Sequence, residues 1–102
     1  MMEKFQREPN GFSYVYEKKL TDYETVILKM PTITPNKRGV NDVGWMAEGD
    51  VTVWGTLSAK PESSDALWQA IEDGDDINKT VSAIKIVNNG PACRVAVRAI
   101  LN

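Results

Sequence analysis

A ten-residue segment close to the C-terminal end of the chain shows the clearest alternation of apolar and polar positions. Along residues 92–101 the apolar side chains share one parity, and they are Cys93, Val95, Val97, Ala99 and Leu101. Arg94 and Arg98 occupy the opposite parity. Because successive side chains of a strand point to opposite faces of its sheet, this segment predicts a β-strand with one apolar and one cationic face.

Residues 80–87 repeat this alternation just upstream. Their central apolar residues share one parity and are Ile84 and Ile86. Lys85 lies between these two on the other parity. The turn signal Asn88-Asn89-Gly90-Pro91 separates the two segments, so the sequence predicts an antiparallel hairpin that forms the floor of a hydrophobic core. In that hairpin Lys85 and the two arginines would form a stripe of cations on the outside of the sheet.

Five segments farther upstream have the composition and length of strands. They are 12–19, 24–30, 43–46, 51–58 and 66–71. Ser64 is also suited to cap a single helical turn over 66–71, and we favour a strand there because every neighbouring segment is one. About seven short strands with turn signals between them predict an all-β fold. We expect a single antiparallel β-sandwich of jelly-roll type, with a small barrel as the alternative.

Parity within these upstream segments predicts which side chains share a face. In 12–19 one face carries Phe12, Tyr14 and Tyr16. In 24–30 one face carries Val26, Leu28 and Met30. In 51–58 Val51 and Val53 face away from Trp54. Aromatic and β-branched residues at period two favour strands that are half-buried against a core.

The length of 102 residues corresponds to one domain. Residues 1–10 are polar and unpatterned, so we expect an N-terminal arm, either frayed or ordered only against a partner, before a sandwich domain at 11–102. The stretch 31–42 contains two prolines and a glycine, which exclude a helix or a central strand and predict a long loop. Lys37 and Arg38 should be exposed at its tip.

Composition narrows the classes of function. The chain has no histidine, one cysteine and a net charge of −2. Histidine is the commonest general base and metal ligand, so we expect no enzyme activity and assign no catalytic, cofactor-binding or metal-binding residue. The net charge gives no reason to expect nucleic acid or an anionic membrane as a partner. No apolar run approaches the roughly 20 residues that span a bilayer, and residues 1–5 lack the apolar core of a signal peptide, so we expect assembly in a cytoplasm.

Two groups of residues are candidate ligand sites. Three tryptophans, at 45, 54 and 68, each have enough apolar area to close the core, and the alternative is an exposed platform that stacks on sugars. The acidic segment 62–76 contains no lysine or arginine, and its part 72–78 offers the oxygen ligands that calcium prefers. That part does not match the spacing of an EF-hand loop, so we favour a solvated turn.

The second half of the chain resembles a known class of protein. The segments that carry the resemblance are Val51-Thr-Val-Trp-Gly-Thr-Leu57, Ser64-Asp-Ala-Leu-Trp-Gln-Ala-Ile-Glu-Asp-Gly74 and the two final runs around Asn88-Asn89-Gly90-Pro91. Their order is similar to that in the small β-sandwich virion proteins of tailed bacteriophages, which include capsid decoration (cement) proteins and minor neck or tail components. The resemblance covers roughly residues 50–102 and transfers no functional residue.

The resemblance implies a non-enzymatic virion protein, assembled in the host cytoplasm, whose partners are further copies of itself and the major capsid or another virion protein. A capsid decoration protein is the leading interpretation. A minor neck or tail component and a carbohydrate-binding β-sandwich module are the alternatives. The expected partner-binding residues are cations, namely Lys37, Arg38, Lys85, Arg94 and Arg98. Because the acidic segment and the cations should lie at different places, we expect head-to-tail association into a cyclic homo-oligomer.

Overall fold

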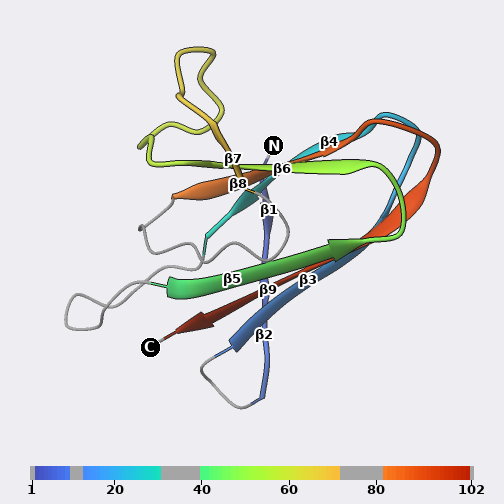
Figure 1. Cartoon of the computed structure of the whole chain (residues 1–102). Helices are drawn as coiled ribbons and strands as arrows, with labels where there is room; N and C mark the ends of the chain where they lie inside the picture. The colour runs from blue at the N-terminus through green and yellow to red at the C-terminus, as the bar shows by residue number, and fades with distance from the viewer. Residues whose placement is uncertain (1, 10–12, 31–39, 72–81, 102) are drawn as a thin grey trace.

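The computed structural model describes residues 2–9, 13–30, 40–71 and 82–101, and these form a two-layered all-β sandwich (Figure 1). One sheet, sheet A, has the strand order β1-β4-β8-β6-β7, and the other, sheet B, has the order β2-β3-β9-β5. The strands of sheet A are β1 Glu3–Lys4, β4 Thr25–Lys29, β8 Ala83–Asn88, β6 Val51–Thr56 and β7 Gln69–Ile71. Those of sheet B are β2 Gln6–Arg7, β3 Ser13–Leu20, β9 Cys93–Leu101 and β5 Val40–Ala47. The predicted β-sandwich is confirmed.

The core lies between the two sheets and is built from the predicted parities. Sheet A contributes, among its most buried side chains, Val26, Leu28, Val53, Ile84 and Ile86. Sheet B contributes Tyr16, Leu20, Val95, Val97 and Ala99. Each set alternates along its strand with exposed or half-buried residues. A period of two in the sequence was therefore sufficient to identify the inward faces, because only one face of each sheet is buried.

The predicted hairpin between the last two strands is wrong. β8 lies in sheet A between β4 and β6, whereas β9 lies in sheet B between β3 and β5. The turn at 88–92 therefore carries the chain across the sandwich, and the apolar faces of the two strands point at each other through the core. An Asn-Gly-Pro turn fits either connection. Each of the two strands instead pairs with two strands from elsewhere in the chain. Its backbone N–H and C=O groups therefore still have partners on both sides, although β8 and β9 do not pair with each other.

Three such crossings lie together at one end of the molecule (Figure 1). We call them arches: arch 1 joins β3 to β4 over Thr21–Glu24, arch 2 joins β5 to β6 over Glu48–Asp50, and arch 3 joins β8 to β9 over Asn89–Ala92. Backbone hydrogen bonds connect neighbouring arches, from Tyr23 N to Gly90 O at 3.1 Å and from Asn89 N to Asp50 O at 2.8 Å. The arches therefore form one continuous layer that ties both sheets together.

Asn88, at the start of arch 3, is the buried polar residue that holds this layer. Its side chain is only 1% exposed. Nδ2 donates to the carbonyl oxygens of Thr21 at 2.9 Å and Pro91 at 3.0 Å, and Oδ1 accepts from Gly90 N at 3.2 Å. These contacts lie away from water. Each hydrogen bond therefore also removes the free-energy penalty that an unpaired buried polar group would cause.

Residues 3–7 of the expected N-terminal arm pair with the sandwich of their own chain. β1 lies parallel to β4 in sheet A, and β2 lies antiparallel to β3 in sheet B. Phe5, between these two short strands, packs against the core. The segment therefore crosses from one sheet to the other along one side of the sandwich, where it covers the edges of β3 and β4.

The predicted loop at 31–42 is shorter than expected, because residues 40–42 belong to β5. A β-bulge between Val40 and Asp42 lets this strand follow β9 to its end. Residues 31–39, which include Lys37 and Arg38, lie outside the described residues. At 69–71 the preferred strand is confirmed as β7, which pairs with β6.

Replacement of Asn88 with alanine should destabilise the sandwich strongly. Asn88→Ala removes, at a buried position, the donor to the carbonyls of Thr21 and Pro91 and the acceptor of the Gly90 N–H, which should lower the free energy of unfolding by about 2–3 kcal/mol. Asn89→Ala is the matched control, because its exposed amide bonds only the Thr52 hydroxyl, and it should cost less than about 1 kcal/mol. Urea unfolding measures both. Equal losses would show that the arches do not depend on Asn88.

The assignment of inward and outward faces on β9 predicts opposite results for two adjacent residues. Val97 is buried, so Val97→Asp should prevent folding because it places an unpaired charge in the core. Arg98 is exposed, and among the described side chains its ion pair is with Glu8, so Arg98→Ser should cost within about 1 kcal/mol. Circular dichroism with thermal unfolding measures both variants. Similar damage from the two substitutions would contradict the register of β9.

Candidate functional site

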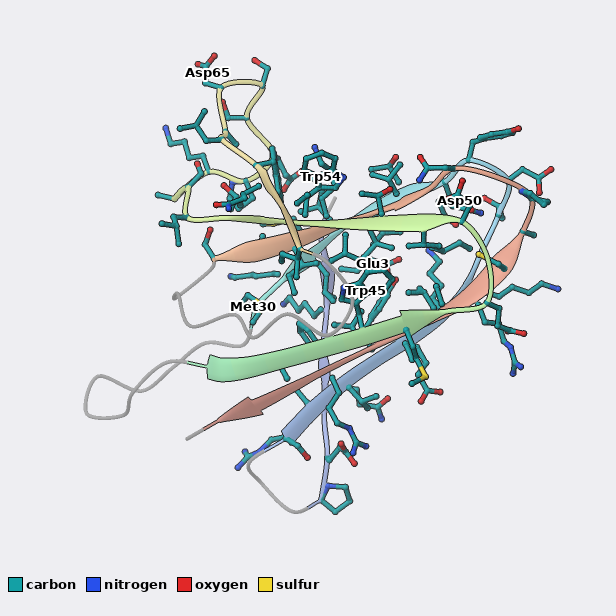
Figure 2. All side chains as sticks on the ribbon, in the orientation of Figure 1. Glu3, Met30, Trp45, Asp50, Trp54 and Asp65 are labelled. Carbon is teal, nitrogen blue, oxygen red and sulfur yellow. The ribbon has the colours of Figure 1, made fainter. Side chains whose placement is uncertain are left out.

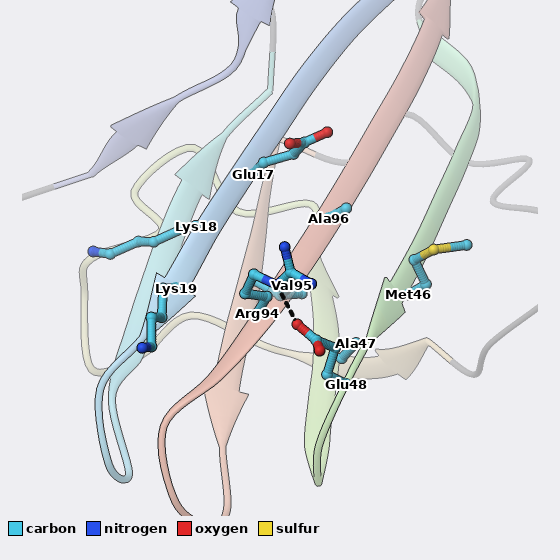
Figure 3. A pocket seen from close by; sticks show the side chains of 9 residues that line it. All are labelled: Glu17, Lys18, Lys19, Met46, Ala47, Glu48, Arg94, Val95 and Ala96. Atoms are coloured by element: carbon cyan, nitrogen blue, oxygen red, sulfur yellow. Dashed lines mark hydrogen bonds and ion pairs between the residues drawn. The ribbon is translucent and has the colours of Figure 1, made fainter.

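The outer face of sheet B carries an open hollow (Figure 3). Strand register places Glu17 of β3 and Met46 of β5 on either side of Ala96 of β9. The small side chain of Ala96 leaves a depression of about 460 Å³ between its larger neighbours. Met46 is 70% exposed at this site, which is unusual for a large apolar side chain. The hollow therefore combines an apolar floor with a charged rim.

Ion pairs satisfy both arginines of this face. The Arg94 guanidinium contacts the Glu48 carboxylate beside the hollow, and it holds the pKa of that carboxyl below its ordinary value. Arg98 Nη2 lies 2.8 Å from a carboxylate oxygen of Glu8. These pairs are largely exposed, so each contributes little to stability. Their main effect is to neutralise charge locally on the rim of sheet B.

The outer face of sheet A has a different character, because two of the three tryptophans lie there. Lys85 of β8 pairs in register with Trp54 of β6, and its Nζ lies 4.6 Å from the centre of the Trp68 ring. Both rings are half-buried (Figure 2 shows Trp54 on the side of β6 away from sheet B). Stacking of an ammonium on an indole is attractive, so the lysine stem and the two rings form one aromatic and cationic surface.

The connection between β6 and β7 adds exposed apolar area beside this surface. It rises from sheet A on the side away from sheet B (Figure 1). Leu57 is 64% exposed and Leu67 is 86% exposed, and both belong to this connection. Two exposed leucines in one connection, beside a surface with two half-buried tryptophans, indicate a contact site, whereas isolated exposed apolar residues are ordinary.

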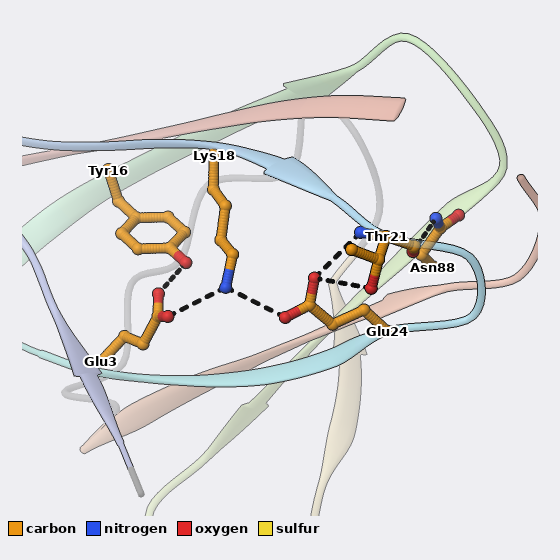
Figure 4. Close-up of polar contacts among 6 residues, drawn as sticks. All are labelled: Glu3, Tyr16, Lys18, Thr21, Glu24 and Asn88. Carbon is orange, nitrogen blue, oxygen red and sulfur yellow. Dashed lines mark hydrogen bonds and ion pairs between the residues drawn. The ribbon is translucent and has the colours of Figure 1, made fainter. Parts of the chain in front are cut away.

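A network of side-chain hydrogen bonds and ion pairs at one edge of the sandwich joins the N-terminal segment to both sheets (Figure 4). The Tyr16 hydroxyl donates to a Glu3 carboxylate oxygen, and Lys18 Nζ lies 3.0 Å from Glu3 Oε1 and 2.9 Å from Glu24 Oε2. Glu24 also accepts from the backbone N–H of Thr21 at 2.9 Å. Carboxylates and the ammonium group alternate along this network. It therefore closes the side of the sandwich where β3 of sheet B lies opposite β1 and β4 of sheet A.

Proton affinities in this network follow from its contacts. The Tyr16 hydroxyl, ahead of Lys18, lowers the pKa of the Glu3 carboxyl below 4.5. The backbone N–H of Thr21 and then Lys18 lower the pKa of Glu24. Burial, with the hydrogen bond to Glu3 second, raises the pKa of the Tyr16 hydroxyl. All three shifts preserve the ionisation states that the hydrogen bonds need at neutral pH.

The structure separates the residues that the sequence predicts as one cationic stripe. Lys85 lies on the outer face of sheet A, while Arg94 and Arg98 lie on the outer face of sheet B, because β8 and β9 are not paired. The single stripe is therefore wrong. Of the acidic segment, Glu62 and Asp65 are described, and the calcium candidate 72–78 lies outside the described residues.

One tryptophan packs against the core and two lie on an outer face, so each of the two interpretations, core packing and an exposed platform, applies to part of the set. Trp45 packs against the core, and its indole Nε1 is buried and has no hydrogen-bond partner among the residues that the structure describes. Trp54 and Trp68 lie on the outer face of sheet A. The polar parity of Trp54, between Thr52 and Thr56, was the signal in the sequence for this outward position. Nothing in the sequence singled out Glu17, Met46 or Leu67.

Comparison with known proteins gives no relative for this chain. No family model matches it, and no curated protein or solved structure does. Within the described ranges, no group of three or more histidine, cysteine, aspartate or glutamate side chains is placed to hold a metal ion. The same ranges contain no helix that is long and apolar enough to cross a membrane.

Acid should weaken the Glu3–Tyr16 contact in a measurable way. Glu3 has a lowered pKa in the folded chain, so its contribution to stability is present above its ordinary pKa of 4.5 and is lost as the pH falls through the lowered value. Tyr16→Phe should raise the pKa of Glu3 in a carboxyl-carbon NMR titration and reduce the acid-dependent part of stability. Tyr14→Phe is the matched control on the same strand and should leave Glu3 unchanged. An unaltered titration in Tyr16→Phe would disprove the contact.

Proposed function

We propose that this chain is a non-enzymatic structural protein of a tailed-bacteriophage virion, a capsid decoration protein that binds the capsid and associates with itself. The observation that carries the proposal is the nested order of strand pairing. β3 pairs with β9, β4 with β8, and β6 with β7. In a jelly roll the chain behaves as one long antiparallel hairpin wound around a core, which produces this nesting. Jelly rolls are common among viral capsid proteins and lectins.

The two outer faces support a role in assembly. Met46 on sheet B and Leu67 in the connection that rises from sheet A between β6 and β7 are exposed large apolar residues on opposite sides of the sandwich. A domain of this size gains stability when such surfaces are covered by neighbours, because a small core leaves much apolar area in contact with water. A virion protein that meets both a capsid and its own copies uses more than one face in this way.

A carbohydrate-binding module is the second candidate, and a specific observation favours it. Trp54 and Trp68 share one outer face, and Lys85 pairs in register with the first and stacks on the second; half-exposed indoles suit the apolar faces of sugar rings. The exposed leucines at 57 and 67 favour a protein partner instead, because a sugar has little apolar surface to cover them. We therefore place capsid binding first.

Capsid binding can be tested with the intact chain. It should co-sediment in saturable amounts with empty capsids assembled from the major capsid protein that is encoded nearest to its own gene. Capsids of an unrelated phage are the control and should not retain it. Absence of any capsid gene nearby, or equal retention by both capsids, would refute the decoration function. Quenching of tryptophan emission by a panel of glycans would then support the carbohydrate-binding alternative.

A further inference from the structure

We propose that copies of this chain stack face to back, with the outer face of sheet A in one subunit seated on the outer hollow of sheet B in the next. The inference rests on the self-association part of the proposed function and specifies the two surfaces that carry it. The occupant of the hollow is thus a second copy of the same chain.

The projecting part of this contact is the connection between β6 and β7. Leu67, at 86%, is the most exposed large apolar side chain in the described part of the molecule, and Leu57 lies in the same connection. Trp68 follows Leu67 directly and stacks on Lys85. Stacking fixes the indole at the base of this projection, so little side-chain entropy remains to be lost when a neighbour covers it.

The receiving part is the hollow on sheet B (Figure 3). Its volume of about 460 Å³ is in the range of sites that enclose large apolar groups. Ala96 provides a floor without long side chains, and the thioether of Met46 stands beside it. Methionine adapts its shape to a partner and makes favourable contacts with aromatic rings, which suits the indole of Trp68.

Charge complementarity favours a second copy over an unrelated partner. Lys85 lies beside the projection on sheet A, and Glu17 lies on the rim of the hollow on sheet B. In the part of the chain that the structure describes, neither side chain forms a direct ion pair, whereas both arginines of β9 do. Glu17 does act on Arg94 at a distance, since its charge helps to raise the pKa of that guanidinium. Face-to-back stacking brings an ammonium without a carboxylate partner towards a carboxylate that is in no direct ion pair, which fixes the register of the contact.

The two surfaces lie on opposite sides of one sandwich, with the core between them. A subunit therefore cannot fill its own hollow, and each contact leaves one projection and one hollow free at the ends of the assembly. Such a heterologous contact closes into a ring when the rotation between subunits allows, and otherwise extends as a column. Both the ring and the column form through the same two faces, which consist of described residues.

Substitutions on each surface should have the same effect on assembly. Leu67→Ser removes the projection and Met46→Ser removes the apolar wall of the hollow, and each should weaken self-association at least about tenfold in sedimentation velocity. Tyr23→Ser is the matched control, because Tyr23 is 72% exposed on arch 1 and lies on neither face. Loss of association in Tyr23→Ser but not in the other two variants would overturn the proposal.

Charge reversal distinguishes this contact from a symmetric one. Lys85→Glu and Glu17→Lys should each assemble poorly alone, because every contact then joins like charges. An equimolar mixture should recover the wild-type assembly, since alternating subunits restore opposite charges at every contact. Circular dichroism confirms that each variant is folded. Failure of the mixture to recover, or a wild-type chain that stays monomeric at all protein concentrations, would overturn the face-to-back contact.

The outcome is separate from that of the capsid experiment. A monomeric wild-type chain that still co-sediments with its capsid would refute the face-to-back contact and leave the decoration function intact. A chain that assembles as described but ignores every capsid would refute the decoration function alone.

Discussion

The buried amide of Asn88 is the contact on which the arrangement of the two sheets depends. Its Nδ2 reaches the Thr21 carbonyl, 67 residues away in the chain, and so joins arch 1 to arch 3. Arch 2 packs closely against the start of β9, since a Cβ on Gly49 would lie 3.0 Å from the Cys93 side chain. A larger residue at 49 would push the β5–β6 crossing away from β9. Three crossings stacked this tightly leave the sheets a single relative position.

The sequence predicted the strands well because their inward faces differ sharply from their outward faces. Ile84, Ile86, Val95 and Val97 are all buried, as their parity requires. The sequence did not show which strands pair with each other, and the turn at 88–91 predicts a hairpin that does not form. A turn motif determines how the chain reverses locally, whereas the choice of sheet depends on bonds to Thr21 and Asp50, which no local pattern reveals.

The candidate surfaces were predicted only in part for the same reason. Parity identifies Arg94 and Lys85 as outward residues, but it cannot tell that their strands belong to different sheets. The hollow depends on cross-strand register, because Glu17, Ala96 and Met46 come from three strands that are distant in sequence. Residues 3–7 escaped prediction because two-residue strands are too short to show a period, and their position depends on tertiary contacts such as Glu3 with Tyr16.

The arches also explain why the outer faces are available for contacts. They concentrate three of the connections between sheets at one end, so these connections run around the sandwich rather than over its faces (Figure 1). The charges on those faces then differ in what they can gain from a neighbour. Arg94 and Arg98 already have carboxylates on their own surface, and a new partner would first have to compete with these. Within the described ranges Lys85 and Glu17 form no direct ion pair, although the charge of Glu17 helps to raise the pKa of Arg94, so electrostatic selection between copies should act through these two side chains.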